Sequence, residues 1–348
     1  MATGPAVWFE TDYVVYTMRQ ASRLSSPPPE GLRPSGGGGS MRTQQDGTAP
    51  SEAGMTRPVG DEGSTRTAYR VLSLGAGVQS SVLALLLSRG DRTLRDLGYP
   101  SPDIAIFADT GWEPEYVYEH LDWLEGELAF PLIRVSAGDL STNLPRAQTV
   151  SGHNFVDVPL FLVDENGKKG MLRRQCTNHY KVRPITRRVR ELAGGIRGRP
   201  FPRDQRVEMW LGISADEVTR MKPSRESWIE HRWPLIDLGM DRQDCLDWFA
   251  AEYPGRDLPR SACVICPYRS DEHWLELKRA EPSSYEEAVN FDRWLRRSRA
   301  NPVRKLISGR PYLHVSRRPL ETVIAERERS GLVASEDFIE ECEGLCGV

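Results

Sequence analysis

The chain has few cysteines for its length and no long apolar run. Six cysteines in 348 residues are too few for a secreted disulfide scaffold, which indicates a reducing compartment. No apolar run approaches the roughly 20 residues that a membrane helix needs. No charged start followed by an apolar core resembles a signal peptide. We therefore expect a cytoplasmic protein with no membrane partner.

The sequence also has little net charge. It contains 46 Lys and Arg against 49 Asp and Glu, a difference of −3. This balance argues against a general nucleic-acid coat protein, although it does not exclude a local basic patch. The apolar share is 39%, and with the 30 glycines it reaches about 48%, which is the range of a globular protein and excludes a wholly disordered chain.

Composition divides the chain into three parts. Residues 1–65 contain a Ser-Ser-Pro-Pro-Pro run and a Gly-Gly-Gly-Gly-Ser run with few apolar residues, so we predict a disordered leader. A misassigned start is the alternative, because Met41 and Met55 both precede the first core strand. We assign residues 66–275 to an α/β nucleotide-binding domain and residues 276–348 to a helical region with a cysteine-containing tail.

Apolar strands alternate with helices from Tyr69 onward. We predict strands over residues 69–73, 103–107, 132–135 and 207–211, and helices over residues 80–87, 115–127 and 183–192. This alternation predicts an α/β fold with a doubly wound, mostly parallel sheet. Ligands bind at the carboxyl ends of such strands, so the turns after the strands are the candidate sites.

The turn after the first predicted strand has the composition of a phosphate-binding loop. Gly75, Ala76 and Gly77 allow backbone N–H groups to approach an anion at a helix N-terminus, and Ser80 and Ser81 add hydroxyl groups. No Gly-Lys-Ser/Thr follows, so the loop is not a Walker A motif. A tight strand–helix turn that needs glycine for packing is the alternative.

This segment resembles the PP-loop of the adenine nucleotide alpha hydrolase superfamily, which includes ATP pyrophosphatases, PAPS and APS reductases and sulfur-insertion enzymes. The usual pattern is S-G-G-x-D-S. Gln79 replaces the Asp, as in the reductase branch, whereas Ser80 is retained. The resemblance implies a Rossmann-like fold and an adenine nucleotide bound by the loop residues Ser73, Gly75, Ala76, Gly77, Gln79, Ser80 and Ser81. The loop does not choose between PAPS, APS and ATP, the last of which would bring Mg²⁺.

Two further turns support the resemblance. Asp109, Thr110 and Gly111 resemble the D-T-G segment of the reductases, which lies near the adenosine. Arg220 resembles the arginine that contacts phosphate or sulfate, a task that suits a guanidinium group. A helix cap at Asp109 and a solvated Arg220 are the alternatives. The resemblance covers residues 69–275 in the expected order.

The cysteines indicate a metal cluster. Cys263 and Cys266 have the spacing of thiolates that bind one metal centre. The segment around Cys176 is similar to the C-C-x-x-R-K-x-x-P-L segment of APS reductases, which bind a [4Fe-4S] cluster; Lys181 matches its Lys, and Thr177 replaces its second Cys. One cluster ligand is therefore missing from the family set.

The tail offers two ways to use its cysteines. In one, Cys346 (or Cys342) completes a four-cysteine cluster with Cys176, Cys263 and Cys266. In the other, Cys342 or Cys346 is a catalytic nucleophile, since the tail resembles the E-C-G-L-H segment of sulfonucleotide reductases. Cys245 lies in an amphipathic stretch, which indicates a core position.

Three functions fit these features. The first is a PAPS reductase-like oxidoreductase, in which a cysteine takes the sulfur group and a thiol donor such as thioredoxin releases sulfite. The second is an ATP-dependent sulfurtransferase that adenylates a tRNA or DNA base, releases pyrophosphate and inserts sulfur from a donor. A dense basic stretch over residues 173–190 favours this version. The third is a non-catalytic nucleotide or Fe-S sensor.

Overall fold

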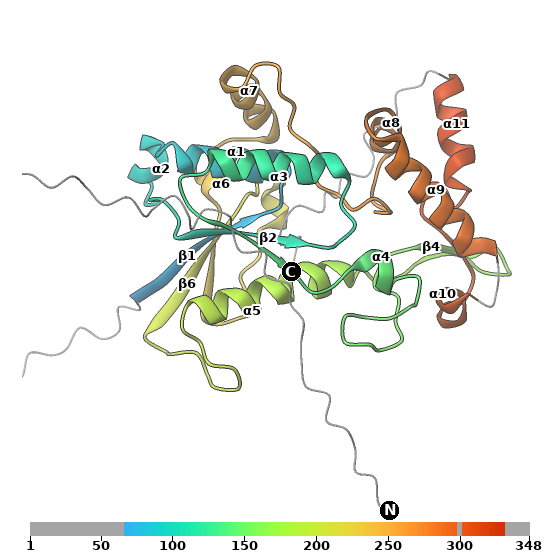
Figure 1. The fold of residues 1–348 in the computed structure, drawn as a ribbon, viewed down its shortest axis with the longest axis horizontal. Coiled ribbons are helices and arrows are strands. Elements are labelled where there is room, and N and C mark those ends of the chain that lie inside the picture. Colours follow the sequence, from blue (N-terminus) through green and yellow to red (C-terminus); the bar gives the residue numbers. More distant parts are fainter. Residues whose placement is uncertain (1–65, 298–300, 331–348) are drawn as a thin grey trace, which may run out of the picture.

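The centre of the molecule is a five-stranded sheet in which every strand pair is parallel (Figure 1). The computed structural model describes residues 66–297 and 301–330, so the predicted leader, Cys342 and Cys346 lie outside the described residues. The strands in spatial order are β3 (Leu132–Ser136), β2 (Ile104–Asp109), β1 (Arg66–Leu74), β6 (Gln205–Leu211) and β7 (Ile229–Arg232).

Helices cover both faces of this sheet. One face carries α1 (Val78–Ser88), α3 (Glu115–Glu127), α6 (Pro234–Asp237) and α7 (Arg242–Glu252), and the other carries α5 (Arg183–Leu192) (Figure 1). The last four residues of the central strand β1 are buried, because helices exclude water from both sides. The fold is therefore the predicted doubly wound α/β class.

The strand order reverses at β1. The chain runs outward from β1 through β2 to β3, and then returns to the other side of β1 as β6. The connections that follow β1 and β6 consequently run in opposite directions along the sheet. The position between these two strands is the switch point, where open α/β sheets bind ligands.

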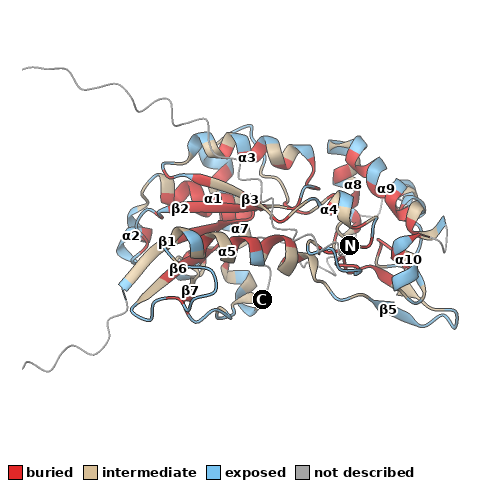
Figure 2. Cartoon of the chain, turned by 60° about the horizontal axis from the view of Figure 1, so that its bottom comes forward, coloured by how far each residue is buried: buried red, intermediate tan, exposed pale blue. Residues whose placement is uncertain are grey.

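A second lobe stands beside the sheet (Figure 2). It contains α8 (Asp271–Ala280), α9 (Pro282–Arg297), α10 (Pro302–Leu306), α11 (Leu320–Ser330) and an antiparallel sheet of β5 (Lys169–Met171), β4 (Phe161–Val163) and β8 (Arg310–Tyr312). Its core joins Trp274 and Phe291 to Trp112 and Leu160, so the lobe packs on side chains from the first half of the chain.

Short elements connect these parts: α2 (Arg92–Asp96), α4 (Leu140–Asn143), the π-helix η2 (Thr177–Val182) and the 3₁₀ helix η3 (Ala215–Arg220). Within the described ranges, no helix has the length and apolar character that a membrane crossing requires.

Candidate functional site

The loop between β1 and α1 is held closed by its own serine. The Oγ of Ser80 accepts hydrogen bonds from the backbone N–H of Gly75 (3.2 Å) and of Gly77 (3.3 Å). Ala76 lies between them at φ +58°, a left-handed conformation that L residues rarely adopt. The sharp turn places this loop at the N-terminus of α1, as the sequence predicts for an anion site.

The loop after β6 touches the start of α1 at Gly212. A Cβ atom on Gly212 would lie 2.7 Å from the Cα of Ser80 and 2.8 Å from its backbone nitrogen. Only glycine permits this approach, because backbone atoms cannot move aside as a flexible side chain can. The loop after β6 and the start of α1 are therefore in direct backbone contact at the switch point of the sheet.

Gln79 connects these two loops. Its Nε2 donates to the Oγ of Ser214 and to Oε2 of Glu217, both at 3.3 Å, and its Oε1 accepts from Arg242 at 2.9 Å. Glu217 also forms an ion pair with Arg220. The predicted phosphate ligands Gln79 and Arg220 therefore belong to one polar network beside the loop, and Gln79 positions the loop through its side-chain amide.

The turn after β2 is organised by Asp109. Its Oδ1 accepts hydrogen bonds from the backbone N–H of Gly111 (2.7 Å) and from the hydroxyl of Tyr118 (2.9 Å). Burial, with the nearby Asp109 carboxylate, raises the pKa of Tyr118 well above its ordinary value. Gly111 has φ +72° and lies against Asp139, so the turn requires glycine.

The three described cysteines that sequence analysis selects as ligands line one pocket. Cys176, Cys263 and Cys266 share it with Thr110 and Lys181. Its empty volume is about 450 Å³. Thr110 follows β2 directly and the glycine loop follows β1, so the pocket and the loop lie at the same carboxyl edge of the sheet.

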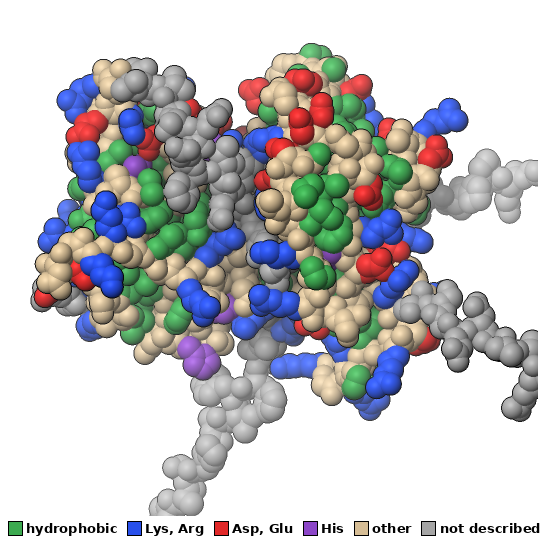
Figure 3. Space-filling view, turned by 180° about the vertical axis from the view of Figure 1, so that it is seen from behind, with side chains coloured by type: hydrophobic (Ala, Val, Ile, Leu, Met, Phe, Trp, Pro, Cys, Tyr) green, Lys and Arg blue, Asp and Glu red, His purple; other side chains and the backbone are tan. Residues whose placement is uncertain are grey.

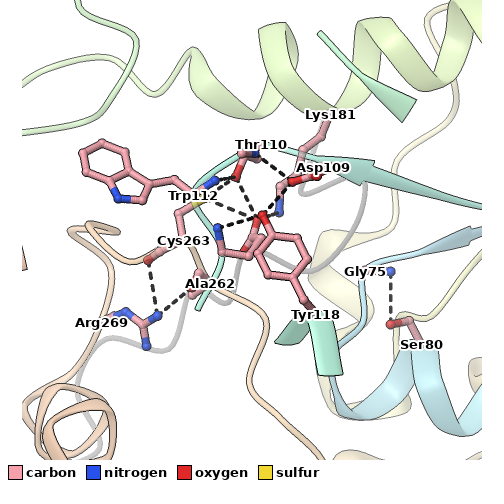
Figure 4. Close-up of polar contacts among 12 residues, drawn as sticks. Gly75, Ser80, Asp109, Thr110, Trp112, Tyr118, Lys181, Ala262, Cys263 and Arg269 are labelled. Atoms are coloured by element: carbon pink, nitrogen blue, oxygen red, sulfur yellow. Dashed lines mark hydrogen bonds and ion pairs between the residues drawn. The ribbon is translucent and has the colours of Figure 1, made fainter. Parts of the chain in front are cut away.

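A buried carboxylate, that of Glu113, connects Cys263 to this edge; Figure 4 shows its neighbours Thr110, Lys181 and Cys263. Oε1 of Glu113 accepts from the hydroxyl of Thr110 at 3.1 Å and lies 3.5 Å from Nζ of Lys181 and from Sγ of Cys263. The Thr110 hydroxyl is itself 3.3 Å from the Cys263 sulfur. The side chains of Glu113 and Lys181 are 0% and 5% exposed, so the charges are compensated within the protein.

Cys176 is positioned by backbone contacts at the start of the π-helix η2. The carbonyl of Asp157 accepts from the N–H groups of Gln175 (2.9 Å) and Cys176 (3.0 Å). The carboxylate of Asp157 lies 2.7 Å from Nδ1 of His179. Burial raises the pKa of Asp157, and the adjacent His179 opposes that rise. π-Helical turns are frequent at functional sites because they redirect side chains.

The three cysteines line the pocket but do not form a ready-made metal site. Within the described residues, no three His, Cys, Asp or Glu side chains converge as ligands of one metal ion. In a [4Fe-4S] cluster each thiolate binds its own iron, so its cysteines must line one pocket without meeting at one point. Lys181 and Arg174 in the wall would offset the negative charge of thiolates. Cys346, the fourth predicted ligand, lies outside the described residues.

Three other polar residues near the site were not selected from the sequence. Glu113 and Asp157 are lone acidic residues without a repeating pattern. His120 forms a 2.9 Å hydrogen bond from Nε2 to the Oγ of Ser81, which directs Ser81 toward α3. Burial lowers the pKa of His120 to about 4. In the sequence, only their position next to the selected segments marks Glu113, Asp157 and His120. Cys245, by contrast, is 0% exposed in the core, where its pattern placed it.

A second depression lies on the α5 side of the sheet. It is lined by four arginines, Arg183, Arg187, Arg190 and Arg225, and has an empty volume of about 1160 Å³. Three of these arginines belong to the basic stretch of the sequence, and Arg225 comes from the loop before β7.

Comparisons with known proteins give little beyond this geometry. No protein-family model matches the chain, and no curated protein sequence is significantly similar to it. Among solved structures, a U34-tRNA thiolase, NcsA from Methanococcus maripaludis with its [4Fe-4S] cluster, matches with 14% identity and a TM-score of 0.33. The match covers 79% of this chain and 85% of that chain.

Proposed function

We propose that the protein is an ATP-dependent sulfurtransferase of the PP-loop type. Its adenine nucleotide would bind where the loop residues 75–77 meet the N-terminus of α1, and its sulfur chemistry would take place at the cysteine pocket. One observation carries the proposal: Cys176, Cys263 and Cys266 line one pocket at the carboxyl edge of the sheet. Two of them lie in one loop and the third comes from a distant segment of the chain.

The chain's own residues suit an activation reaction. Orphan N–H groups at the start of α1 and the helix dipole would stabilise the negative charge of the phosphates. The network of Gln79, Glu217 and Arg220 would hold the adjacent loop rigid. Activation transfers the adenylyl group to a carbonyl oxygen of the acceptor and releases pyrophosphate, and a sulfur donor then displaces AMP.

A [4Fe-4S] cluster, when bound, would supply a site for labile sulfur. Cys176, Cys263 and Cys266 would hold it, and the Thr110 hydroxyl would hydrogen-bond the Cys263 sulfur from the surrounding shell. Lys181 would offset the charge of the thiolates while remaining paired with Glu113.

The basic depression beside α5 favours this reading over the reductase reading. None of the loop residues 75–81 belongs to its lining, so its four arginines would be available to a polyanionic acceptor such as tRNA or DNA and not to the nucleotide at the loop. A PAPS or APS reductase with a tail-cysteine nucleophile is the second candidate, supported by Gln79 in the loop.

Nucleotide preference tests the two candidates directly. The full chain, purified without oxygen, is titrated with ATP, APS and PAPS by calorimetry. We expect a preference for ATP, with pyrophosphate released in the presence of acceptor. A preference for APS or PAPS with sulfite release would replace the proposal by the reductase, and no binding at millimolar concentration would leave a non-catalytic sensor.

Iron content tests the cysteine pocket. Cys176→Ala, Cys263→Ala and Cys266→Ala should each lose most of the iron and acid-labile sulfide that the unaltered protein carries after anaerobic reconstitution. Cys245→Ala is the matched control, because Cys245 is a core cysteine outside the pocket. Equal iron in all four variants would contradict the assignment.

A further inference from the structure

The depression between α5 and the loop before β7 has the character of a polyanion site. Its described lining includes Arg183, Arg187, Arg190 and Arg225. Of the described side chains in this lining, Glu226 alone carries a carboxylate, and that carboxylate accepts a 2.9 Å hydrogen bond from the indole of Trp228. The four arginines outnumber the carboxylates that adjoin them: Glu226 in the lining, and Glu191 and Asp157 outside it, which interact with Arg187 and Arg183.

The arginines differ in the interactions that they make with other groups of the protein. Arg187 shares Glu191 with its helix neighbour Arg188, and Arg190 donates to the carbonyl of Arg199 and lies over the ring of Trp228. Arg183 and Arg225 are exposed and approach the groove from two different elements. Three arginines spaced along α5, with a fourth from the loop before β7, suit a phosphate chain better than a single phosphate group.

The groove is wider than the cysteine pocket. Its empty volume, which includes the open solvent above it, is about 1160 Å³ against about 450 Å³ for the pocket. Trp228 and Met209 in its lining are only 7% and 1% exposed, so cations and not aromatic rings form its accessible surface. Such a surface contacts the phosphates of a strand and not its bases.

The π-helix η2 separates this groove from the cysteine pocket. Thr177 and Lys181 line the pocket, whereas Asn178 and Val182 of the same helical turns line the groove. The two sites therefore lie on different sides of a single helix, whose diameter with side chains is about 10 Å. On the face drawn in Figure 3, Lys and Arg side chains gather along the hollow between the two lobes.

We propose that this groove, walled by Arg183, Arg187, Arg190 and Arg225, binds the phosphodiester backbone of a nucleic-acid strand and so delivers the acceptor base to the cysteine pocket across η2. The delivery of an acceptor base by this groove rests on the proposed function, whereas the binding of a nucleic-acid strand to the groove does not. The chemistry recognised is a chain of phosphodiesters, shared by RNA and DNA.

Binding is measured with the full chain and a fluorescein-labelled tRNA pool by fluorescence anisotropy over a series of KCl concentrations. Arg183→Gln/Arg225→Gln should weaken binding by roughly tenfold and reduce the slope of log Kd against log salt by about two, one for each lost phosphate contact. Arg92→Gln/Arg95→Gln is the matched control, because it removes two exposed charges from α2 on the other side of the sheet. Equal weakening of tRNA binding by the two double substitutions would overturn the assignment of this groove as the binding site.

Competition identifies the ligand class. Unlabelled single-stranded RNA and DNA of the same length show which backbone binds better, and either result supports a phosphodiester site. Inorganic polyphosphate that competes as well as RNA, or ATP that removes RNA completely, would overturn it. The assay is repeated without nucleotide and with Cys263→Ala. If RNA binding persists under these conditions and still depends on Arg183 and Arg225, the groove binds nucleic acid even where the proposed sulfur chemistry fails.

Discussion

At the scale of single residues, the geometry of the nucleotide loop depends on Gly212. This glycine is not in the loop, but it lies against the backbone of Ser80 and so sets the distance between the ends of β1 and β6. The sequence marks Gly212 only as the residue after a strand, because the close approach is created by the pairing of β1 with β6.

Gly212→Ala should distort the loop. A methyl group 2.7 Å from the Cα of Ser80 must displace backbone atoms, and we expect a loss of about 1–3 kcal/mol in the free energy of unfolding. ATP affinity should fall roughly tenfold or more, since the loop amides move away from the phosphates. Urea unfolding and calorimetry measure the two effects.

Gly126→Ala is the control for this variant. Gly126 lies inside α3 with open space around its Cα, and alanine there should raise stability by up to about 1 kcal/mol. If Gly212→Ala binds ATP as tightly as Gly126→Ala does, the loop is not held by this contact.

At the scale of elements, the Lys181–Glu113 pair joins η2 to the turn that precedes α3. The two side chains are almost fully buried and come from segments that are far apart in the sequence. Sequence analysis selected Lys181 from its place in a resembling motif, but a single glutamate such as Glu113 gives no pattern that predicts burial. Its environment arises only when β2, η2 and the loop at Cys263 pack together.

Lys181→Met should destabilise the protein by about 3 kcal/mol or more, because it leaves the buried Glu113 carboxylate without its counter-charge. Lys181→Met/Glu113→Leu should recover part of that loss, since the uncompensated charge is removed. Urea unfolding of both variants and of Glu113→Leu completes a double-mutant cycle. Additive effects of the two substitutions would show that the pair makes no direct interaction.

Longer elements were easier to predict than short ones. The helices predicted over residues 115–127 and 183–192 have the bounds of α3 and α5, because an amphipathic pattern or a proline start is visible over several turns. The antiparallel strands β4, β5 and β8 have three residues each, which is too short for alternation to show. Their pairing follows from tertiary contacts within the second lobe, where β4 pairs with the distant β8.

At the scale of the whole molecule, the buried His120 and the half-buried His273 should make stability depend on pH. Burial is the main cause that lowers the pKa of His120 to about 4 and that of His273 to about 3. The unfolded chain binds protons at these residues below about pH 6.5, whereas the folded chain does not. The unfolded state therefore takes up more protons as the pH falls, and stability decreases from pH 6.5 downward.

We expect each histidine to reduce the free energy of unfolding by up to about 1.4 kcal/mol per pH unit below pH 6.5. His120→Gln, which keeps a partner for Ser81, should show a smaller decrease than the unaltered protein. Urea midpoints measured at about pH 7.5 and pH 5 give the comparison. An unchanged decrease in His120→Gln would assign the acid sensitivity to other groups.

Sequence reasoning reached the fold class and the segments of the candidate site, but not how the site is held together. The Cys263–Cys266 spacing and the motif around Cys176 each identify a segment, and the structure brings those segments into one pocket. The role of the second lobe in supporting it was not visible, because Val264 and Ile265 share a core with helices α8 and α9 that follow them in the chain.

The same arrangement fixes an order of events during synthesis. The strands β1, β2 and β3 and the loop at residues 75–77 are complete before β6 emerges to close the sheet, and the loop at Cys263 appears later still. The helices that cover Val264 and Ile265 come last. Contacts across such long separations form slowly, so the three thiols of a nascent chain stay exposed until the segments that cover them have emerged. Under the proposed function, loading of a cluster would therefore follow translation, and oxidants would have most access to the cysteines in that interval.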